Sequence, residues 1–153
     1  MTEAQNTVSA SGRCVCGACV FVADLPVQKD GRVKADVCHC GMCRRWAGAP
    51  LMAVEPASAP RFEGSAPVSV YASSDWAERG FCKTCGTGLF WRMRDGSHLS
   101  MPAGLFDDQS VFDLKVEIFI DHKPAFYDFA GERPRMTEAE VVAAFTGGAE
   151  ENS

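Results

Sequence analysis

The eight cysteines of this sequence occur in short, ordered groups, and these groups restrict the possible folds more than any other feature. The groups are Cys14-Val-Cys16, Cys38-His-Cys40-Gly-Met-Cys43 and Cys82-Lys-Thr-Cys85-Gly. In a C-x-x-C-G turn the two thiolates converge, and the glycine lets the backbone fold around them. Two such half-sites from distant parts of a chain can together bind one zinc ion through four sulfur atoms. The clusters therefore predict a chain that folds around metal.

Disulfide bonds are the alternative use of eight cysteines, and an exported protein would favour them. The N-terminal residues show no basic segment followed by an apolar one, so we expect no signal peptide. No stretch approaches the roughly 20 apolar residues that cross a bilayer. We therefore expect a cytoplasmic protein with reduced thiols. The short spacings also favour metal over disulfides.

Seven of the cysteines divide into two unlike sites, so two Zn²⁺ ions per chain are expected. A closed, structural site takes the first and third clusters, whose ligands are Cys14, Cys16, Cys82 and Cys85. An open site takes the second cluster, whose ligands are Cys38, Cys40 and Cys43. Three protein ligands leave the fourth position vacant, which is typical of catalytic zinc.

Two residues leave alternatives to this assignment. Cys19 is interpreted as a small buried side chain, although it could pair with Cys16 as a further C-x-x-C. His39 could be a fourth ligand of the open site. However, side chains alternate along an extended backbone, so His39 should point away from a metal held by Cys38 and Cys40. We therefore favour a histidine that is bonded to nearby backbone.

A zinc ion with three thiolate ligands carries a formal charge of −1, which makes it a poor site for generating hydroxide. It can still take a fourth thiolate, because coordination deprotonates a thiol. The site therefore suggests a thiol substrate. Arg44 and Arg45 directly follow the cluster and could bind substrate carboxylates, or they could be solvated charges. Trp46 is a further candidate at the border of the substrate site.

The rest of the sequence predicts a single, mainly β domain, because short runs rich in β-branched and aromatic residues alternate with Gly, Pro, Ser and Asp. A chain of 153 residues can bury a sizeable core. The zinc-binding β domain is placed at 12–146, between a disordered N-terminal arm at 1–11 and a disordered tail at 147–153. Strands are expected at Val15–Ala23, Arg32–Cys38, Pro50–Glu55, Val68–Ala72, Leu89–Arg94, His98–Pro102 and Val116–Ile120.

Two helices are expected. One is a short helix at Gly41–Ala47. The other is Thr137–Phe145, where Thr137 and Glu140 can form a capping box. Gly147 and Gly148 should end this second helix. Its apolar side chains are expected to pack on the sheet, and they are Val141, Val142 and Phe145.

The cysteine clusters and their flanking residues resemble the glutathione-dependent formaldehyde-activating enzyme family, which includes centromere protein V-like domains. The similar segments lie between about residues 12 and 130. They are GRCVCGA at 12–18, CHCGMCRRWAG at 38–48, RGFCKTCGTGLFW at 79–91, LSMPAGLFD at 99–107 and EIFID at 117–121.

The resemblance implies a β-tent fold of packed sheets, with the same division into structural and catalytic zinc ligands. It also implies a carbon–sulfur lyase that condenses glutathione with formaldehyde to S-hydroxymethylglutathione. Two alternatives remain, a non-catalytic thiol carrier and a zinc-stabilised interaction module. Nucleic-acid binding is disfavoured by the net charge of −5, and no membrane partner is expected.

Overall fold

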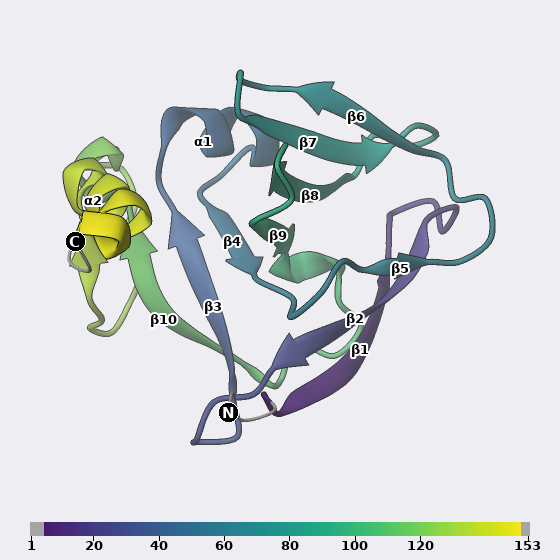
Figure 1. Cartoon of the computed structure of the whole chain (residues 1–153), viewed down its shortest axis with the longest axis horizontal. Coiled ribbons are helices and arrows are strands. Elements are labelled where there is room, and N and C mark those ends of the chain that lie inside the picture. Colours follow the sequence, from purple (N-terminus) through teal and green to yellow (C-terminus); the bar gives the residue numbers. More distant parts are fainter. Residues whose placement is uncertain (1–4, 151–153) are drawn as a thin grey trace. The chain divides into compact units, whose positions relative to one another are not determined.

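The computed structural model describes residues 5–150, and these form a mainly β protein, as predicted (Figure 1). The strands are β1 Thr7–Arg13, β2 Val20–Pro26, β3 Val33–Cys38, β4 Leu51–Val54, β5 Arg61–Phe62, β6 Val68–Ala72, β7 Ala77–Cys82, β8 Gly88–Met93, β9 Leu99–Pro102, β10 Phe112–Ile118 and β11 Arg135–Met136. The helices are α1 Gly41–Ala47, α2 Glu138–Glu150 and the 3-10 turns η1 Ala103–Leu105 and η2 Ile120–His122.

The described residues fall into two compact units, one of 5–35 and 53–113 and the other of 36–52 and 114–150. Strands β3, β4 and β10 contribute residues to both units. Each of the two cysteine clusters that could bind metal lies wholly within one unit. The assignment of a single domain at 12–146 stays a prediction.

The first unit contains an antiparallel sheet of order β1-β2-β5, in which β1 and β2 pair along their whole length. It also contains the strand order β4-β9-β8-β7-β6. Aromatic side chains fill its interior, where Phe21 contacts Phe106 edge to face, with ring centroids 5.2 Å apart. Both of these rings are buried. The β1–β2 and β7–β8 turns of this unit carry the first and third cysteine clusters.

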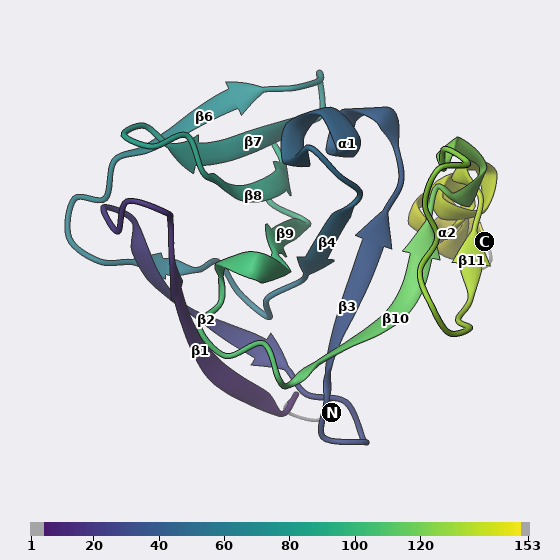
Figure 2. The same ribbon diagram turned by 180° about the vertical axis from the view of Figure 1, so that it is seen from behind.

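The second unit has the strand order β11-β10-β3-β4. Strands β10 and β11 are parallel, with Glu117 opposite Arg135, and Figure 2 shows β11 beside α2. The predicted capping box is present, because the N–H of Glu140 donates to the Thr137 hydroxyl and the N–H of Thr137 donates to the Glu140 carboxylate. The turn between β3 and α1, where the second cysteine cluster lies, also belongs to this unit.

Two expectations about boundaries near the N-terminus were wrong. The N-terminal arm placed at 1–11 ends earlier, because residues 7–13 form β1 and pair with β2. Residues 1–4 of that arm and 151–153 of the expected tail lie outside the described residues. The strand expected from Val15 begins only at Val20, because residues 15–19 form turns and bends.

The last helix also differs from the prediction. It runs through Gly147 and Gly148 to Glu150, although glycine is a weak helix former. Of its three apolar residues only Val141 is buried, whereas Val142 and Phe145 are about half exposed. The helix therefore contacts its unit by a narrower face than the sequence suggested.

Replacement of Gly12 by alanine should destabilise the first unit. A Cβ at this position would overlap the backbone carbonyl oxygen of Leu105 and the ring of Phe21. We expect the free energy of unfolding to fall by about 1–3 kcal/mol, as for other overpacked sites. Urea unfolding at an unchanged m-value would measure this loss. Gly104→Ala is the control, because nothing lies within 4 Å of its added Cβ. Equal midpoints for the two variants would contradict the expected clash.

Candidate metal centre

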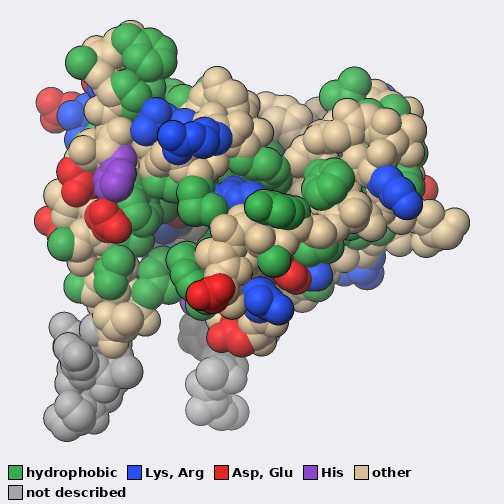
Figure 3. Space-filling model, turned by 90° about the horizontal axis from the view of Figure 1, so that it is seen from above, with side chains coloured by type: hydrophobic (Ala, Val, Ile, Leu, Met, Phe, Trp, Pro, Cys, Tyr) green, Lys and Arg blue, Asp and Glu red, His purple; other side chains and the backbone are tan. Residues whose placement is uncertain are grey.

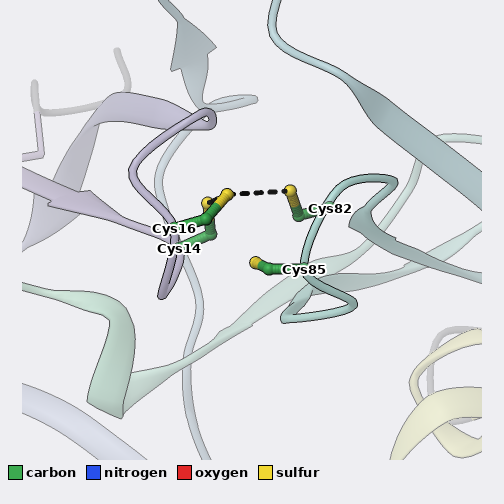
Figure 4. Close-up of side chains that lie close together, drawn as sticks. All are labelled: Cys14, Cys16, Cys82 and Cys85. Atoms are coloured by element: carbon green, nitrogen blue, oxygen red, sulfur yellow. Dashed lines mark hydrogen bonds between the residues drawn. The ribbon is translucent and has the colours of Figure 1, made fainter.

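Four sulfur atoms of the first unit converge from two turns (Figure 4). Cys14 and Cys16 lie in the turn after β1, whereas Cys82 ends β7 and Cys85 lies in the turn before β8. The four Sγ atoms are all within 4.8 Å of one another. Cys14 and Cys82 are buried, and Cys16 and Cys85 are exposed. The structure thus brings together the four cysteines that the sequence assigned to a closed site.

The spacing of these sulfurs fits a tetrahedral metal ion. With zinc–sulfur bonds of about 2.3 Å, the edges of a tetrahedron are about 3.8 Å long. The Sγ atoms of Cys14 and Cys16 are 3.6 Å apart, and those of Cys16 and Cys82 are 3.8 Å apart. No disulfide joins the described cysteines. The donor set could therefore hold a zinc ion.

The thiols of this site hinder one another from ionising together. Hydrogen bonds from the Thr87 hydroxyl and N–H lower the pKa of Cys85 to about 5. The N–H of Ala18 lowers the pKa of Cys16, but partial desolvation and the neighbouring cysteines outweigh it and raise this pKa to about 12. Four crowded thiolates need a cation to offset their repulsion, which a divalent metal ion supplies.

Two residues around the four sulfurs support this geometry. The Thr87 hydroxyl accepts from the N–H of Val15 at 3.1 Å and lies 3.0 Å from the Cys85 sulfur, so it links the two turns. Cys19 is fully buried, as predicted, and its N–H donates to the Cys14 sulfur at 3.3 Å. Cys19 is not among the four converging sulfurs. Cys19 therefore supports the site through its backbone N–H and not through its thiol.

The second unit brings together the sulfurs of Cys38, Cys40 and Cys43, also within 4.8 Å of one another. Cys38 ends β3, Cys43 is buried in the first turn of α1, and Cys40 is the N-cap of that helix. The Cys40 sulfur accepts from the N–H of Cys43 at 3.4 Å. The local strand-to-helix turn therefore forms the whole cluster, and no fourth donor joins it among the described residues.

The pKa values of the thiols in the three-cysteine cluster differ even more than those in the four-cysteine site. Hydrogen bonds from the thiols of Cys38 and Cys43 lower the pKa of Cys40 to about 2. The same proximity raises the pKa of Cys38 far above its ordinary range, chiefly through Cys40. The crowded sulfurs therefore oppose simultaneous ionisation of the three thiols. A metal ion that binds all three as thiolates must displace the remaining protons.

His39 lies between two of these cysteines but is turned away from their sulfurs and is fully buried. Its Nε2 is 2.9 Å from Oε1 of Glu117, and its Nδ1 is 2.8 Å from the hydroxyl of Tyr127. The expectation that His39 is no ligand agrees with this geometry. The expected bond to backbone was wrong, because both ring nitrogens bond to side chains. No sequence pattern indicates these contacts, since Glu117 and Tyr127 lie 78 and 88 positions away from His39.

Arg44 and Arg45 fold back toward Gly41, which directly follows Cys40. An ideal Cβ on Gly41 would lie 3.0 Å from Nη1 of Arg45 and 3.8 Å from Nη2 of Arg44, so the two guanidinium groups approach one point. Nε of Arg44 also donates to the carbonyl of His39 at 2.9 Å. Trp46 is half-buried on the same helix. The structure places positive charge beside the three-cysteine cluster.

A third group of potential metal ligands comprises Asp121, His122 and Glu138, all exposed. Asp121 accepts from the N–H of Glu138 at the start of α2, and His122 contacts the Glu138 carboxylate at 2.8 Å. These contacts at the first turn of α2 explain why the three side chains lie close together. We assign it no metal.

Figure 3 shows one face of the molecule, on which Lys and Arg side chains are interspersed with hydrophobic and acidic ones. No helix of the described residues has the length and apolar character needed to span a membrane.

Comparison with known proteins identifies the class of this chain. The model of the glutathione-dependent formaldehyde-activating enzyme family matches residues 9–122, so the chain belongs to this family. An uncharacterized lyase of Schizosaccharomyces pombe is 35% identical over 132 residues, which cover 86% of this chain and 93% of the relative. A solved Rhodobacter sphaeroides protein shares 22% identity at a TM-score of 0.48, covering 82% of this chain and 98% of its own.

Proposed function

We propose that this chain is a zinc-dependent carbon–sulfur lyase that joins a small thiol such as glutathione to an aldehyde such as formaldehyde. The observation that carries the proposal is the cluster of Cys38, Cys40 and Cys43, which offers three sulfur donors and no fourth among the described residues. Membership of the family and the relative that is named a lyase support the same class of reaction.

The reaction requires a thiol to lose its proton and attack a carbonyl carbon. Zinc bound by the three cysteines would hold a thiol in its deprotonated form. The sulfur–carbon bond forms as the carbonyl π bond opens, and the carbonyl oxygen takes up a proton equivalent to the one that the thiol released. Because the reaction is reversible, the same site can also release the aldehyde.

The chain's own residues would bind the rest of the substrate. Glutathione carries two carboxylates, and guanidinium groups bind carboxylates through paired, charge-assisted hydrogen bonds. The convergence of Arg44 and Arg45 beside Cys40 suits this task. Trp46 remains a candidate substrate-binding residue at the edge of the same surface.

Exchange NMR of glutathione and formaldehyde, with and without the purified zinc-loaded protein, tests the proposed reaction. We expect the protein to accelerate formation and breakdown of S-hydroxymethylglutathione over buffer. Absence of acceleration, together with tight binding of glutathione, would instead support a thiol carrier. Absence of both would leave a zinc-stabilised interaction module as the better description.

Substitution of Arg45 by alanine should weaken the binding of glutathione. Arg45 is exposed, so we expect a rise of about 3- to 10-fold in KM with little change in kcat, since a contact made equally in ground and transition states is lost. Steady-state kinetics would measure this. Cysteamine, a thiol without carboxylates, should show no such rise. Arg94→Ala provides a matched exposed arginine in the first unit. An equal effect on both thiols would contradict carboxylate recognition.

A further inference from the structure

His39 is fixed at four points of its backbone and side chain. Its N–H donates to the carbonyl of Ile118 at 3.1 Å, and its own carbonyl accepts from Arg44. Its ring lies between Glu117 and Tyr127, at 2.9 and 2.8 Å. The ring cannot rotate without breaking its hydrogen bonds to both Glu117 and Tyr127.

Glu117, the partner of His39, is itself held in place. Its side chain is fully buried, and its second oxygen accepts from Nη1 of Arg133 at 3.0 Å and from Nε of Arg135 at 3.3 Å. Burial opposes ionisation of Glu117, but the bonds from His39 and Arg133 outweigh it and lower the pKa of this carboxyl. An ionised carboxylate only accepts hydrogen bonds, so Nε2 of His39 carries a proton toward it.

The position of His39 in the chain connects this network to the three-cysteine cluster. Successive side chains of an extended segment point to alternate faces. Cys38 and Cys40, the neighbours of His39 in sequence, therefore point to the face opposite that of His39. When the ring is fixed inward against Glu117 and Tyr127, the sulfurs of Cys38 and Cys40 are directed outward together. Arg44, which follows Cys43, is bonded to the His39 carbonyl and so fixes the other end of the turn.

We propose that His39, held by Glu117 and Tyr127, is a positioning residue that preorganises the three-cysteine cluster and thereby sets its affinity for metal. The inference rests on the metal-binding part of the proposed function and on no assumption about the substrate. Residues that orient metal ligands typically change metal affinity by about 10- to 100-fold when they are replaced. His39 acts here through its neighbours in sequence, without touching the metal.

Metal affinity of the two sites, measured separately, tests this proposal. Zn²⁺ would be titrated against a competing chelator, and Co²⁺ would report on sulfur ligation through its thiolate charge-transfer absorption. We expect His39→Ala to weaken the three-cysteine site by about 10- to 100-fold and to leave the four-cysteine site unchanged. His39→Gln, whose amide can still donate toward Glu117, should restore part of the loss. His98→Ala is the control, as an exposed histidine paired with Glu55.

Tyr127→Phe keeps the experiment informative if the His39 variants fail to fold. It removes one hydroxyl from a half-buried residue, and we expect a smaller weakening of the same site, of about 3- to 10-fold. Unchanged affinity in the folded variants, or an equal loss at both sites, would overturn the positioning role. A wild-type protein that binds metal at the four-cysteine site alone would refute the proposed three-cysteine site itself, and the inference would fall with it.

Discussion

Replacing Cys82 by serine is expected to remove one zinc ion and to destabilise the fold. Cys82 is buried and belongs to a cluster that joins two turns far apart in sequence. Loss of the bound metal removes folding free energy. We expect a loss of about 2–5 kcal/mol, similar to that of a native disulfide, and a fall in Tm of about 10 °C. Calorimetry and zinc quantification would measure both effects, and solubility should fall as well.

Cys19→Ala is the matched control for this variant. Cys19 is buried beside the same cluster but is not among its four converging sulfurs. Its replacement should leave the zinc content unchanged. Loss of a zinc ion in Cys19→Ala would instead favour the alternative pairing of Cys16 with Cys19.

Replacing Cys40 by serine is expected to remove the other zinc ion while the fold is kept. Cys40 is the N-cap of α1, and its sulfur accepts from the N–H of Cys43. Serine is a favourable N-cap residue, so its hydroxyl can take over this bond and preserve the helix. We expect Tm to stay within a few degrees of wild type and the rate of adduct formation to fall by at least about 100-fold, since the thiol would lose its metal partner.

The comparison of the two cysteine variants tests the division into structural and catalytic sites. Equal destabilisation by Cys82→Ser and Cys40→Ser would contradict it. Retention of adduct formation in Cys40→Ser would place the chemistry elsewhere on the chain. Thermal unfolding and exchange NMR on the same preparations separate these outcomes.

Local features of the sequence predicted much of the site. The spacing within each cluster depends on turns of a few residues, so Cys38, Cys40 and Cys43 could be grouped directly. The bounds of α1 were correct, and the capping box of α2 forms as expected. The two distant half-sites also lie together in the structure, as the sequence predicted, because a two-ligand turn needs a partner to complete four ligands.

Long-range contacts could not be predicted in this way. Glu117 lies in a strand that alternates apolar and charged residues, and this pattern gives no indication of its partners. Its contact with His39 depends on the pairing of β3 and β10, which only the folded chain reveals. Strand β1 was missed because its residues are small and polar, and pairing with β2 overrides their weak strand preference.

The four-cysteine cluster has a consequence for the order in which the first unit folds. The sulfurs of Cys16 and Cys82 meet although the residues are 66 positions apart. Each pair of cysteines lies in its own turn, so the two halves can form early and independently. Joining them requires closure of a long loop, which is the slow step in chains with many distant contacts. A metal ion bound first by the two cysteines of one turn would therefore stay partly ligated until the two hairpins come together. Metal supply should then affect the rate of refolding as well as the final stability.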